Sequence, residues 1–297
     1  MSIRLVTYNI LSSELCSSQY FNTIDVKHLD PENRFELLKE FLTKEIALES
    51  IICLQEVSRS WADKLLVFFR NHRYTFSNTS YGNKHNGFMG VAIAFPDCYD
   101  LIECNTKRIS DDIIELPNEP ETWLTKIPYF GSWFKPTISE EQLHTIEAKS
   151  KFNVLYSIKL NRDKCYFWVS TYHMPCSFTK PIIMKLHAEC VRSHFLKLTA
   201  NNVGFLCGDF NTTPEQIAYS IINKQPLFDI FDECERPISY HSTNISGSFC
   251  DTIDYIWYHD PECFIKAVGT DIPVVENDIP DGKHPSDHIP IIADFTL

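Results

Sequence analysis

Strand-like and helix-like segments alternate along this chain in two similar halves, with no internal repeat or linker. Each half carries two amphipathic helical patterns and several short segments rich in β-branched and aromatic residues. Helices of this kind bury their apolar face when they cover a sheet. We therefore predict an α/β fold in one domain over residues 1–297: a four-layered α/β/β/α sandwich of two mixed sheets flanked by helices.

Hydrophobic spacing and turn residues set the boundaries of the predicted elements. Strands are expected over residues 3–9, 50–54, 73–78, 88–95, 152–160, 165–172, 203–207, 252–258, 264–270 and 289–295. Helices are expected over residues 31–46, 60–71, 181–199 and 214–223. Residues 239–248 form a polar stretch with no clear period.

Residues 97–150 have the least regular pattern, because four prolines interrupt them. Their aromatic side chains crowd together: Trp123, Tyr129, Phe130, Trp133 and Phe134. We interpret the interval as an insertion or long loop whose rings pack on the sandwich, since aromatic residues usually bury themselves. An alternative stays open, in which the rings form a substrate wall on which bases stack.

The composition allows a large core, since 44% of the 297 residues are hydrophobic and 13% are aromatic. The chain has 27 Lys and Arg against 39 Asp and Glu, a formal net charge of −12. This balance argues against a non-specific nucleic-acid coat protein, which gains affinity by neutralising phosphates with cations. It leaves open an enzyme that acts on phosphates through a bound divalent metal.

The eleven cysteines, an odd number with irregular spacing and no C-x-x-C pair, resemble neither a disulfide framework nor a zinc site. Cys53, Cys165, Cys190 and Cys207 lie in apolar runs, as buried thiols do. No apolar run is long enough for a bilayer, and the first residues lack a secretory pattern. We expect a monomer without a membrane partner in a reducing compartment, the cytoplasm, with the nucleus left open.

Asp209 and Asn211 stand two residues apart directly after a short apolar strand. Thr213 is expected as the N-cap of the next helix, with Pro214 at its first position and Gln216 closing a capping box. An acid and an amide two residues apart in an extended segment point the same way. Both would therefore lie at the carboxyl end of a strand, where α/β folds bind ligands.

Polar residues end several other predicted strands as well. The candidates are Asn9, Glu56, His173, Asp209, Asn211, Asp254, Asp287 and His288. Each alone has an ordinary structural explanation, such as a turn residue, a first-turn helix acid or a partly buried histidine. Their recurrence at the ends of separate strands favours one shared site.

These residue types suit metal-assisted attack on a phosphate ester. Mg²⁺ prefers oxygen ligands and keeps several waters, so one or two protein carboxylates suffice. The metal polarises a phosphoryl oxygen, a carboxylate or imidazole takes the proton of the attacking water, and a second imidazole stabilises developing charge. Asp254 faces away from its neighbours Ile253 and Tyr255, and a carboxylate in such an apolar strand needs a partner, for which a histidine is suited.

Six motifs give the sequence a resemblance to the endonuclease/exonuclease/phosphatase superfamily, in that family's order. They are Tyr8-Asn9, Leu54-Gln55-Glu56, Thr171-Tyr172-His173, Gly208-Asp209-Phe210-Asn211, Ile253-Asp254-Tyr255 and Ser286-Asp287-His288. Residues 8–11, 52–57 and 254–257 are most similar to the branch of deadenylases, nocturnin, Angel proteins and 2′-phosphodiesterases. Two departures stand out: residues 28–34 lack a tryptophan usual there, and residues 173–176 differ from the usual sequence.

The resemblance implies one or two Mg²⁺ ions, with Mn²⁺ as an alternative. Glu56 would be the principal metal ligand with Asn9 beside it, and Asp287 would assist a second ion. His173 would hydrogen-bond the scissile phosphate, and Asn211 would hold the phosphate or a bound water.

The remaining implied roles concern the water and the charge on the phosphate. Asp209 would activate or position the attacking water. Asp254 would orient His288, which serves either as a base or as the charge partner of the phosphate.

We therefore expect a metal-dependent hydrolase of phosphate esters, an RNA 3′-exonuclease of deadenylase type with RNA favoured over DNA as its substrate. Two alternatives within enzymes are a DNA endonuclease of abasic-site type and a phosphatase of a small phosphorylated molecule, which the acidic charge makes more credible. An alternative of another class is a catalytically inactive binding module. The presence of every metal and phosphate residue argues against that last alternative.

Overall fold

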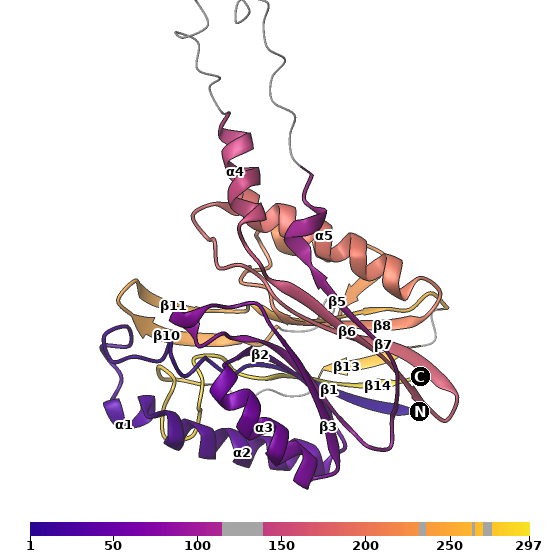
Figure 1. The fold of residues 1–297 in the computed structure, drawn as a ribbon, viewed down its shortest axis with the longest axis horizontal. Helices are drawn as coiled ribbons and strands as arrows, with labels where there is room; N and C mark the ends of the chain where they lie inside the picture. Colours follow the sequence, from indigo (N-terminus) through magenta and orange to yellow (C-terminus); the bar gives the residue numbers. More distant parts are fainter. Residues whose placement is uncertain (115–138, 232–235, 263–264, 270–274) are drawn as a thin grey trace, which may run out of the picture.

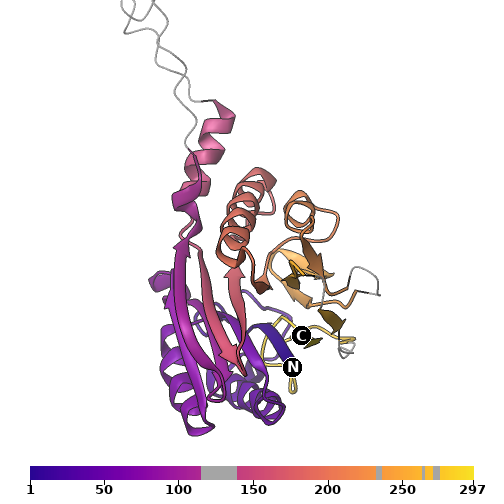
Figure 2. The same ribbon diagram turned by 90° about the vertical axis from the view of Figure 1, so that its right-hand side faces the viewer.

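The computed structural model describes residues 1–114, 139–231, 236–262, 265–269 and 275–297. Two six-stranded sheets pack face to face, and helices cover both outer faces (Figure 1). The N- and C-termini lie side by side at one end of the molecule (Figure 2), because the first and last strands of the chain are paired. The predicted four-layered α/β/β/α sandwich is confirmed.

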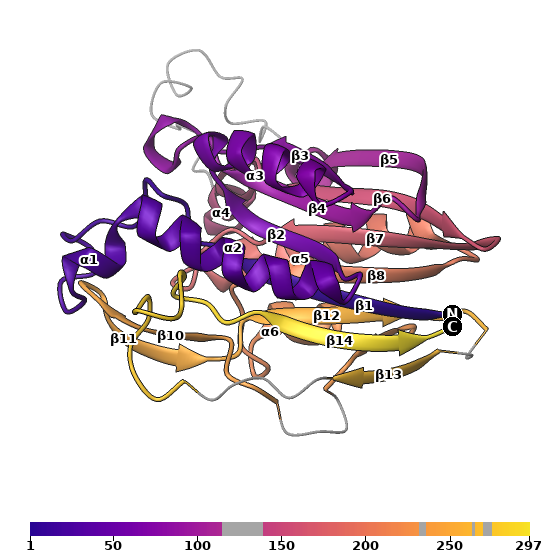
Figure 3. The same cartoon turned by 90° about the horizontal axis from the view of Figure 1, so that it is seen from below.

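The first sheet has the strand order β13-β14-β1-β2-β4-β3. Its strands are β1 (Ser2–Asn9), β2 (Ile51–Val57), β3 (Tyr74–Ser80), β4 (Gly90–Pro96), β13 (Lys266–Gly269) and β14 (Ile291–Thr296). β1 and β2 are parallel, and the other neighbouring pairs are antiparallel. Helices α2 (Pro31–Ala47) and α3 (Arg59–Asn71) cover its outer face, as the view from below shows (Figure 3).

The second sheet has the strand order β5-β6-β7-β8-β12-β9. Its strands are β5 (Asp100–Arg108), β6 (Val154–Arg162), β7 (Cys165–His173), β8 (Val203–Asp209), β9 (Leu227–Asp229) and β12 (Asp254–His259). β7 and β8 are parallel, and β12 runs antiparallel to β8. Helices α5 (Pro181–Thr199) and α6 (Ile217–Ile222) pack on its outer face.

Short elements complete the described part of the chain. They are α1 (Val26–Leu29), α4 (Glu140–Lys149), the 3₁₀ turns Lys84–Asn86 and Ile109–Asp112, and a hairpin of β10 (Tyr240–Asn244) and β11 (Gly247–Asp251). The hairpin lies at the opposite end of the sandwich from the termini (Figure 1).

Three apolar clusters join the four layers. Val169 and Phe205 belong to the cluster between the sheets, where both side chains are fully buried. Trp61 of α3 lies in the cluster under the first sheet, and Phe195 of α5 lies in the cluster over the second. Burial of one such side chain stabilises the fold by roughly 1.5–3 kcal/mol, so these clusters are what fixes the sheets against each other.

Capping residues begin the helices of the first half. The Asp30 carboxylate accepts from the backbone N–H groups of Glu32 and Asn33, and Pro31 is the first residue of α2. The predicted start of this helix is confirmed. α3 begins at Arg59, one residue before the predicted start, because the Ser58 hydroxyl is its cap.

Strand directions bring the polar strand ends to one end of the molecule. Parallel pairing aligns the carboxyl ends of β1 with β2 and of β7 with β8. Antiparallel pairing starts β12 beside the end of β8 and β14 beside the end of β1. Four strand ends and two strand beginnings therefore lie together.

The prediction of a helix starting at Pro214 is wrong. α6 begins at Ile217, and Gln216 is its N-cap residue. The Gln216 side-chain oxygen accepts from the Thr213 N–H at 3.2 Å and from the Thr212 hydroxyl at 3.1 Å. These bonds hold residues 212–216 as a turn, which leaves Pro214 outside the helix.

Part of the interval 97–150 is more regular than its sequence indicates. β5 pairs with β6 as an edge strand of the second sheet, and α4 ends the interval. The aromatic cluster Trp123, Tyr129, Phe130, Trp133 and Phe134 lies outside the described residues, so both interpretations of it stay predictions. The polar stretch 239–248 contributes to the β10–β11 hairpin.

The buried cysteines are predicted in part. Cys53 and Cys207 are fully buried between the sheets, whereas Cys165 and Cys190 are half-buried. In the described part of the chain, none of the helices combines the length and the apolar character that a bilayer span requires.

Candidate active site

Polar residues from both sheets meet at the end of the sandwich where the strand ends gather. Asp209 at the end of β8 lies between His173 of β7 on one side and Asp254 of β12 on the other. Asn9 pairs with Gln55 across β1 and β2, which places Glu56 beside it. The structure thus brings residues from separate predicted strands into one cluster.

Asn9 joins the two sheets at this point. Its side-chain nitrogen Nδ2 donates to Asp209 Oδ2 at 2.9 Å and to Glu56 Oε1 at 3.2 Å. The backbone N–H of Leu11 donates to its carbonyl oxygen at 3.0 Å, which fixes the carboxamide from its other end. Two carboxylates held on one amide repel each other, and a cation bound between them would relieve that repulsion.

Glu56 stands on an irregular turn of backbone. Its φ is 56°, in the left-handed region, and the register between β2 and β4 shifts between Leu54 and Val57. Such a conformation costs about 1–3 kcal/mol and persists where the surroundings impose it. The Ser12 N–H donates to Glu56 Oε2 at 3.0 Å, so the carboxylate is held toward Asn9.

His173 has a different partner on each ring nitrogen. Nε2 lies 3.4 Å from Asp209 Oδ2 and 3.9 Å from Glu56 Oε1. Nδ1 lies 2.6 Å from the Tyr81 hydroxyl. Burial raises the pKa of Tyr81, so this hydroxyl stays protonated and can donate to Nδ1. The proton of the neutral imidazole then resides on Nε2, which faces the carboxylates.

Asp254 and His288 form a buried pair. His288 Nδ1 lies 2.8 Å from Asp254 Oδ2, which also accepts from the Ser239 hydroxyl at 2.7 Å. The second nitrogen of the ring, Nε2, lies 3.7 Å from Asp209 Oδ2. Asp254 Oδ1 is buried and has no hydrogen-bond partner among the described residues. His288 is thus the partner that the apolar surroundings of Asp254 demand.

The charge of this pair favours a protonated imidazole. Burial opposes the cation, but the carboxylates of Asp254 and Asp209 outweigh burial and raise the pKa of His288. Burial raises the pKa of Asp254, although the positive charge of His288 acts in the opposite direction. The pair therefore shares one proton that resides on the histidine.

Asn211 and Asp287 lie at the margin of the cluster. Asn211 has φ 47°, its N–H donates to Asp209 Oδ1 at 2.8 Å, and its Nδ2 donates to the Met174 carbonyl at 3.0 Å. Asp287 is 6% exposed, and the Ser286 hydroxyl lies 3.4 Å from its Oδ1. Burial raises the pKa of Asp287, and the charge of Glu56 adds to that effect.

The donor atoms of this cluster fit a hard divalent metal. Ligand atoms of Asp209, Asp254 and His288 lie within 4.8 Å of one another, and a metal ion bound by all three would displace the proton of His288. On the other side of Asp209, the Glu56 carboxylate adds oxygen atoms, and Asn9 Nδ2 donates to both carboxylates. Oxygen ligands at a buried, mutually repelling pair of carboxylates suit Mg²⁺ or Mn²⁺ better than a thiophilic metal.

Two residues of the site escape sequence reasoning. Tyr81 lies in a polar, turn-like segment, and Ser239 begins the polar stretch before β10. Neither has a local signal, because each meets its partner only when distant segments pack together. Both act on side chains that the sequence does indicate, His173 and Asp254.

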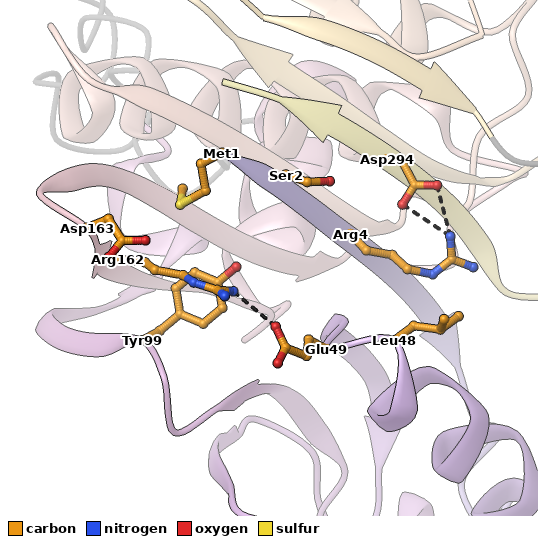
Figure 4. Close-up of a pocket in the computed structure, with 9 residues that line it drawn as sticks. All are labelled: Met1, Ser2, Arg4, Leu48, Glu49, Tyr99, Arg162, Asp163 and Asp294. Carbon is orange, nitrogen blue, oxygen red and sulfur yellow. Dashed lines mark hydrogen bonds and ion pairs between the residues drawn. The ribbon is translucent and has the colours of Figure 1, made fainter.

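A hollow of about 720 Å³ lies at the end of β1 that is opposite to this cluster (Figure 4). Arg4 binds Asp294 there at 3.0 Å, and Arg162 binds Glu49 at 3.2 Å. Each guanidinium already has a carboxylate, so neither attracts a phosphate. The hollow lacks the histidines and the carboxylate pair, and we place no chemistry in it.

Comparison with known proteins gives relatives of the predicted kind. Xenopus laevis Nocturnin is 29% identical over 103 residues, which cover 31% of this chain and only 26% of that protein. RNA exonuclease NGL1 of Saccharomyces cerevisiae is 26% identical over 337 residues, covering 99% of this chain and 92% of the relative. The crystal structure of ANGEL2, described as a 2′,3′-cyclic phosphatase, superposes with a TM-score of 0.74 at 16% identity, over 99% of this chain and 95% of that one.

The predicted resemblance is confirmed at the level of the whole chain. The profile of the Endonuclease/Exonuclease/phosphatase family matches residues 6–288, an interval that contains all six motifs. The chain therefore belongs to the endonuclease/exonuclease/phosphatase family, a family of phosphoester hydrolases.

Proposed function

We propose that this protein is a Mg²⁺-dependent phosphodiesterase that removes nucleotides from the 3′ end of RNA. The observation that carries the proposal is the meeting of Asn9 and two histidines around the Asp209 carboxylate, with the Glu56 carboxylate beside them. Asp209 Oδ2 lies within 3.7 Å of Asn9 Nδ2, His173 Nε2 and His288 Nε2. Such a cluster of acids, bases and hydrogen-bond donors suits hydrolysis of a phosphate ester.

Glu56 and Asn9 would hold the principal metal ion, with Mn²⁺ as a substitute for Mg²⁺. Glu56 and Asp209 both accept from the Asn9 side-chain nitrogen, so a cation bound near both carboxylates would offset the repulsion between them. A bound ion would polarise a phosphoryl oxygen and screen the negative charge of the substrate. A second ion would use Asp287, whose buried carboxylate lies close enough to Glu56 for the negative charge of Glu56 to help raise the pKa of Asp287.

The protein side chains divide the remaining tasks. The Nε2–H of His173 would donate to the scissile phosphate, with Asn211 beside it. Asp209 would accept the proton of the attacking water. His288 would act as the charge partner of the phosphate, because the carboxylates that raise its pKa keep it protonated. Asp254 would hold that imidazole in position through Nδ1.

A nucleotide substrate is supported by aromatic rings that lead outward from His288. The Tyr240 ring lies 4.9 Å from the His288 ring, Phe249 lies 5.6 Å from Tyr240, and Phe178 lies 6.3 Å from Phe249. Phe249 is 37% exposed and Phe178 is 45% exposed. Exposed rings next to a phosphate site offer stacking surfaces for nucleobases.

The second candidate is a phosphatase of a small phosphorylated molecule, which the net charge of −12 favours. An acidic protein gains little from the phosphates of a long nucleic acid beyond the few in its site. The fold is shared with ANGEL2, which is described as a 2′,3′-cyclic phosphatase, so a cyclic nucleotide belongs among the substrates to test.

A substrate screen separates these functions. The full chain is incubated in Mg²⁺ or EDTA with end-labelled oligo(A), an abasic DNA duplex, a 2′,3′-cyclic nucleotide and a panel of sugar phosphates. The proposal predicts stepwise shortening of oligo(A) from its 3′ end, in Mg²⁺ only. Hydrolysis of the small molecules alone would favour the phosphatase, cleavage of the duplex alone the endonuclease, and no hydrolysis the inactive binding module.

A further inference from the structure

Arg34 is a fully buried arginine of α2 that contacts two separate loops of the candidate site. Its Nη2 donates to the backbone carbonyls of Ile10 at 2.8 Å and Leu11 at 2.6 Å. Its Nε donates to the carbonyl of Pro285 at 2.5 Å. The guanidinium carbon lies 5.0 Å from the centre of the Trp61 ring, so the guanidinium packs over the indole.

The first loop, residues 9–12, orients the two metal-facing side chains. The Leu11 N–H holds the Asn9 carboxamide, and the Ser12 N–H holds the Glu56 carboxylate. Leu11 has φ 51°, a left-handed conformation that a leucine does not adopt without support. The hydrogen bond from Arg34 to the Leu11 carbonyl fixes the peptide group between Leu11 and Ser12. That peptide group includes the Ser12 N–H, which donates to Glu56.

The second loop, residues 285–288, carries the other half of the site. The Ser286 hydroxyl donates to the backbone carbonyl of Asn9 at 2.7 Å, and the His288 N–H donates to the Ser286 hydroxyl at 3.2 Å. Arg34 holds the carbonyl immediately before Ser286. The two loops are thus joined twice, once by the serine and once by the guanidinium.

A buried guanidinium costs free energy, and here Nη1 of Arg34 is buried without a hydrogen-bond partner among the described residues. An apolar side chain would fill the same space more cheaply. An ammonium group is a single point donor, whereas the planar guanidinium presents several N–H groups in a fixed fork. The guanidinium reaches carbonyls of both loops at once, because its Nε donates to one loop and its Nη2 to the other. The geometry therefore selects arginine for its shape as well as its charge.

We propose that Arg34 is a positioning residue, which sets the distance between the Asn9–Glu56 half of the site and the Asp287–His288 half. The proposal rests on the proposed hydrolysis of a phosphate ester at this site. Arg34 itself does not touch the cluster of reacting groups. Its effect would be exerted through the backbone of the two loops, where a displacement of about 1 Å can cost 10²-fold in rate.

The test compares Arg34→Gln and Arg34→Lys with the wild type and with Arg4→Gln. Arg4 is the control, because its guanidinium also bridges two separate segments, through the side chains of Glu45 and Asp294, but at the far end of β1. Two quantities are measured: kcat and KM on the substrate that the wild type hydrolyses, and hydrogen–deuterium exchange of residues 9–12 and 285–288 in the free protein.

Positioning predicts that Arg34→Gln lowers kcat by about 10²-fold with little change in KM. Exchange should rise in both loops together, and Arg4→Gln should change neither quantity. Arg34→Lys keeps the positive charge on an aliphatic stem, so it is the second variant to use if Arg34→Gln fails to fold. It should still lose kcat, because one ammonium group cannot bridge both loops.

Three outcomes would overturn the inference. The first is that Arg34→Lys shows faster exchange in the loops and yet keeps a kcat within threefold of the wild-type value. The second is a loss of kcat with unchanged exchange, which would mean a direct chemical role. The third is exchange that rises in one loop only. Since exchange needs no substrate, it tests the link between the loops even if the wild type hydrolyses none of the substrates offered.

Discussion

The ring of His173 presents one nitrogen to the carboxylates and the other to the Tyr81 hydroxyl. The protonated phenol can donate to Nδ1, and in that arrangement the imidazole carries its proton on Nε2. Without this partner, the imidazole would populate both tautomers. In one of them Nε2 would present a lone pair where a phosphate needs a hydrogen-bond donor. Residues that fix tautomers in this way typically change affinity or activity by 10–100-fold when removed.

Removal of the Tyr81 hydroxyl tests this assignment. Tyr81→Phe should lower kcat about tenfold, since the ring remains but the tautomer of His173 is no longer fixed. Tyr74→Phe is the control, because its hydroxyl binds the Ile46 carbonyl away from the site. Steady-state kinetics and a thermal melt are compared for both variants. Equal kcat for Tyr81→Phe and wild type would show that the tyrosine has no part in orienting His173.

His187 is a buried histidine outside the site, and it makes stability depend on pH. Its Nε2 donates to the Ala148 carbonyl at 3.0 Å and its Nδ1 accepts from the Tyr172 hydroxyl at 2.8 Å, so the neutral ring is satisfied. Burial lowers the pKa of His187 to about 4 from an ordinary value of 6.5. Between these two values the unfolded chain binds the proton more tightly, so the folded state loses stability as pH falls.

The expected loss from this histidine is about 3 kcal/mol between pH 7 and pH 4. Urea unfolding at several pH values measures it, with His187→Gln as the comparison. The glutamine variant should be less stable at pH 7, and the difference between the two proteins should shrink steadily as the pH falls from 6.5 to 4. A difference that stays constant over this range would contradict the account.

At the scale of elements, the β10–β11 hairpin and the segment after β7 form one side of the site. Phe249 comes from β11, and Phe178 comes from the segment between β7 and α5. Tyr240 of β10 contacts both Phe249 and His288, so the hairpin transmits its position to the reaction centre. The sheet ends supply the chemistry, and these two segments supply contact area.

Substitution of Phe249 separates contact area from chemistry. Phe249→Ala should raise KM for oligo(A) about tenfold and leave kcat nearly unchanged, because stacking of one base contributes about 1–3 kcal/mol. Ile245→Ala serves as the control, since Ile245 is 65% exposed at the hairpin turn and has no ring. Equal KM values for both variants would mean that the base does not stack on this hairpin.

The sequence predicts the elements whose signals are local. Alternating and apolar runs identify β1, β7 and β8, and capping residues identify α2. The start of α6 is wrong because the Gln216 side chain binds residues 212 and 213 in a turn, which a local pattern cannot distinguish from a capping box. β5 and β11 are largely exposed, so their pairing depends on neighbouring strands.

The same distinction applies to the site. Asp254 carries a local signal, since a carboxylate within an apolar strand demands a partner, and His288 lies there. The contacts of Asn9 with Glu56 and Asp209 connect residues 47 and 200 positions apart, so they arise from the packing of the sheets. Tyr81, Ser239 and Arg34 serve side chains or backbone of distant segments, and for that reason their roles emerge only in three dimensions.

For the whole molecule, the sandwich works as a rigid support on which two sheets present complementary groups. The first sheet contributes Asn9 and Glu56, and the second contributes His173, Asp209 and Asp254. The buried layer between them, which includes Phe205 and Val169, fixes the distance that the site requires. In the proposed function, a metal ligand from the first sheet would face the histidines and Asp209 of the second.

The most direct test of this account is the Mg²⁺-dependent turnover of oligo(A) by Glu56→Ala beside wild type. Glu40→Ala, an exposed acid on α2, is the matched control. The account predicts that Glu56→Ala loses at least ~10²-fold in kcat at saturating Mg²⁺ with an unchanged melting temperature, while Glu40→Ala keeps full activity. Turnover by Glu56→Ala within threefold of wild type, in Mg²⁺ and in EDTA alike, would contradict it.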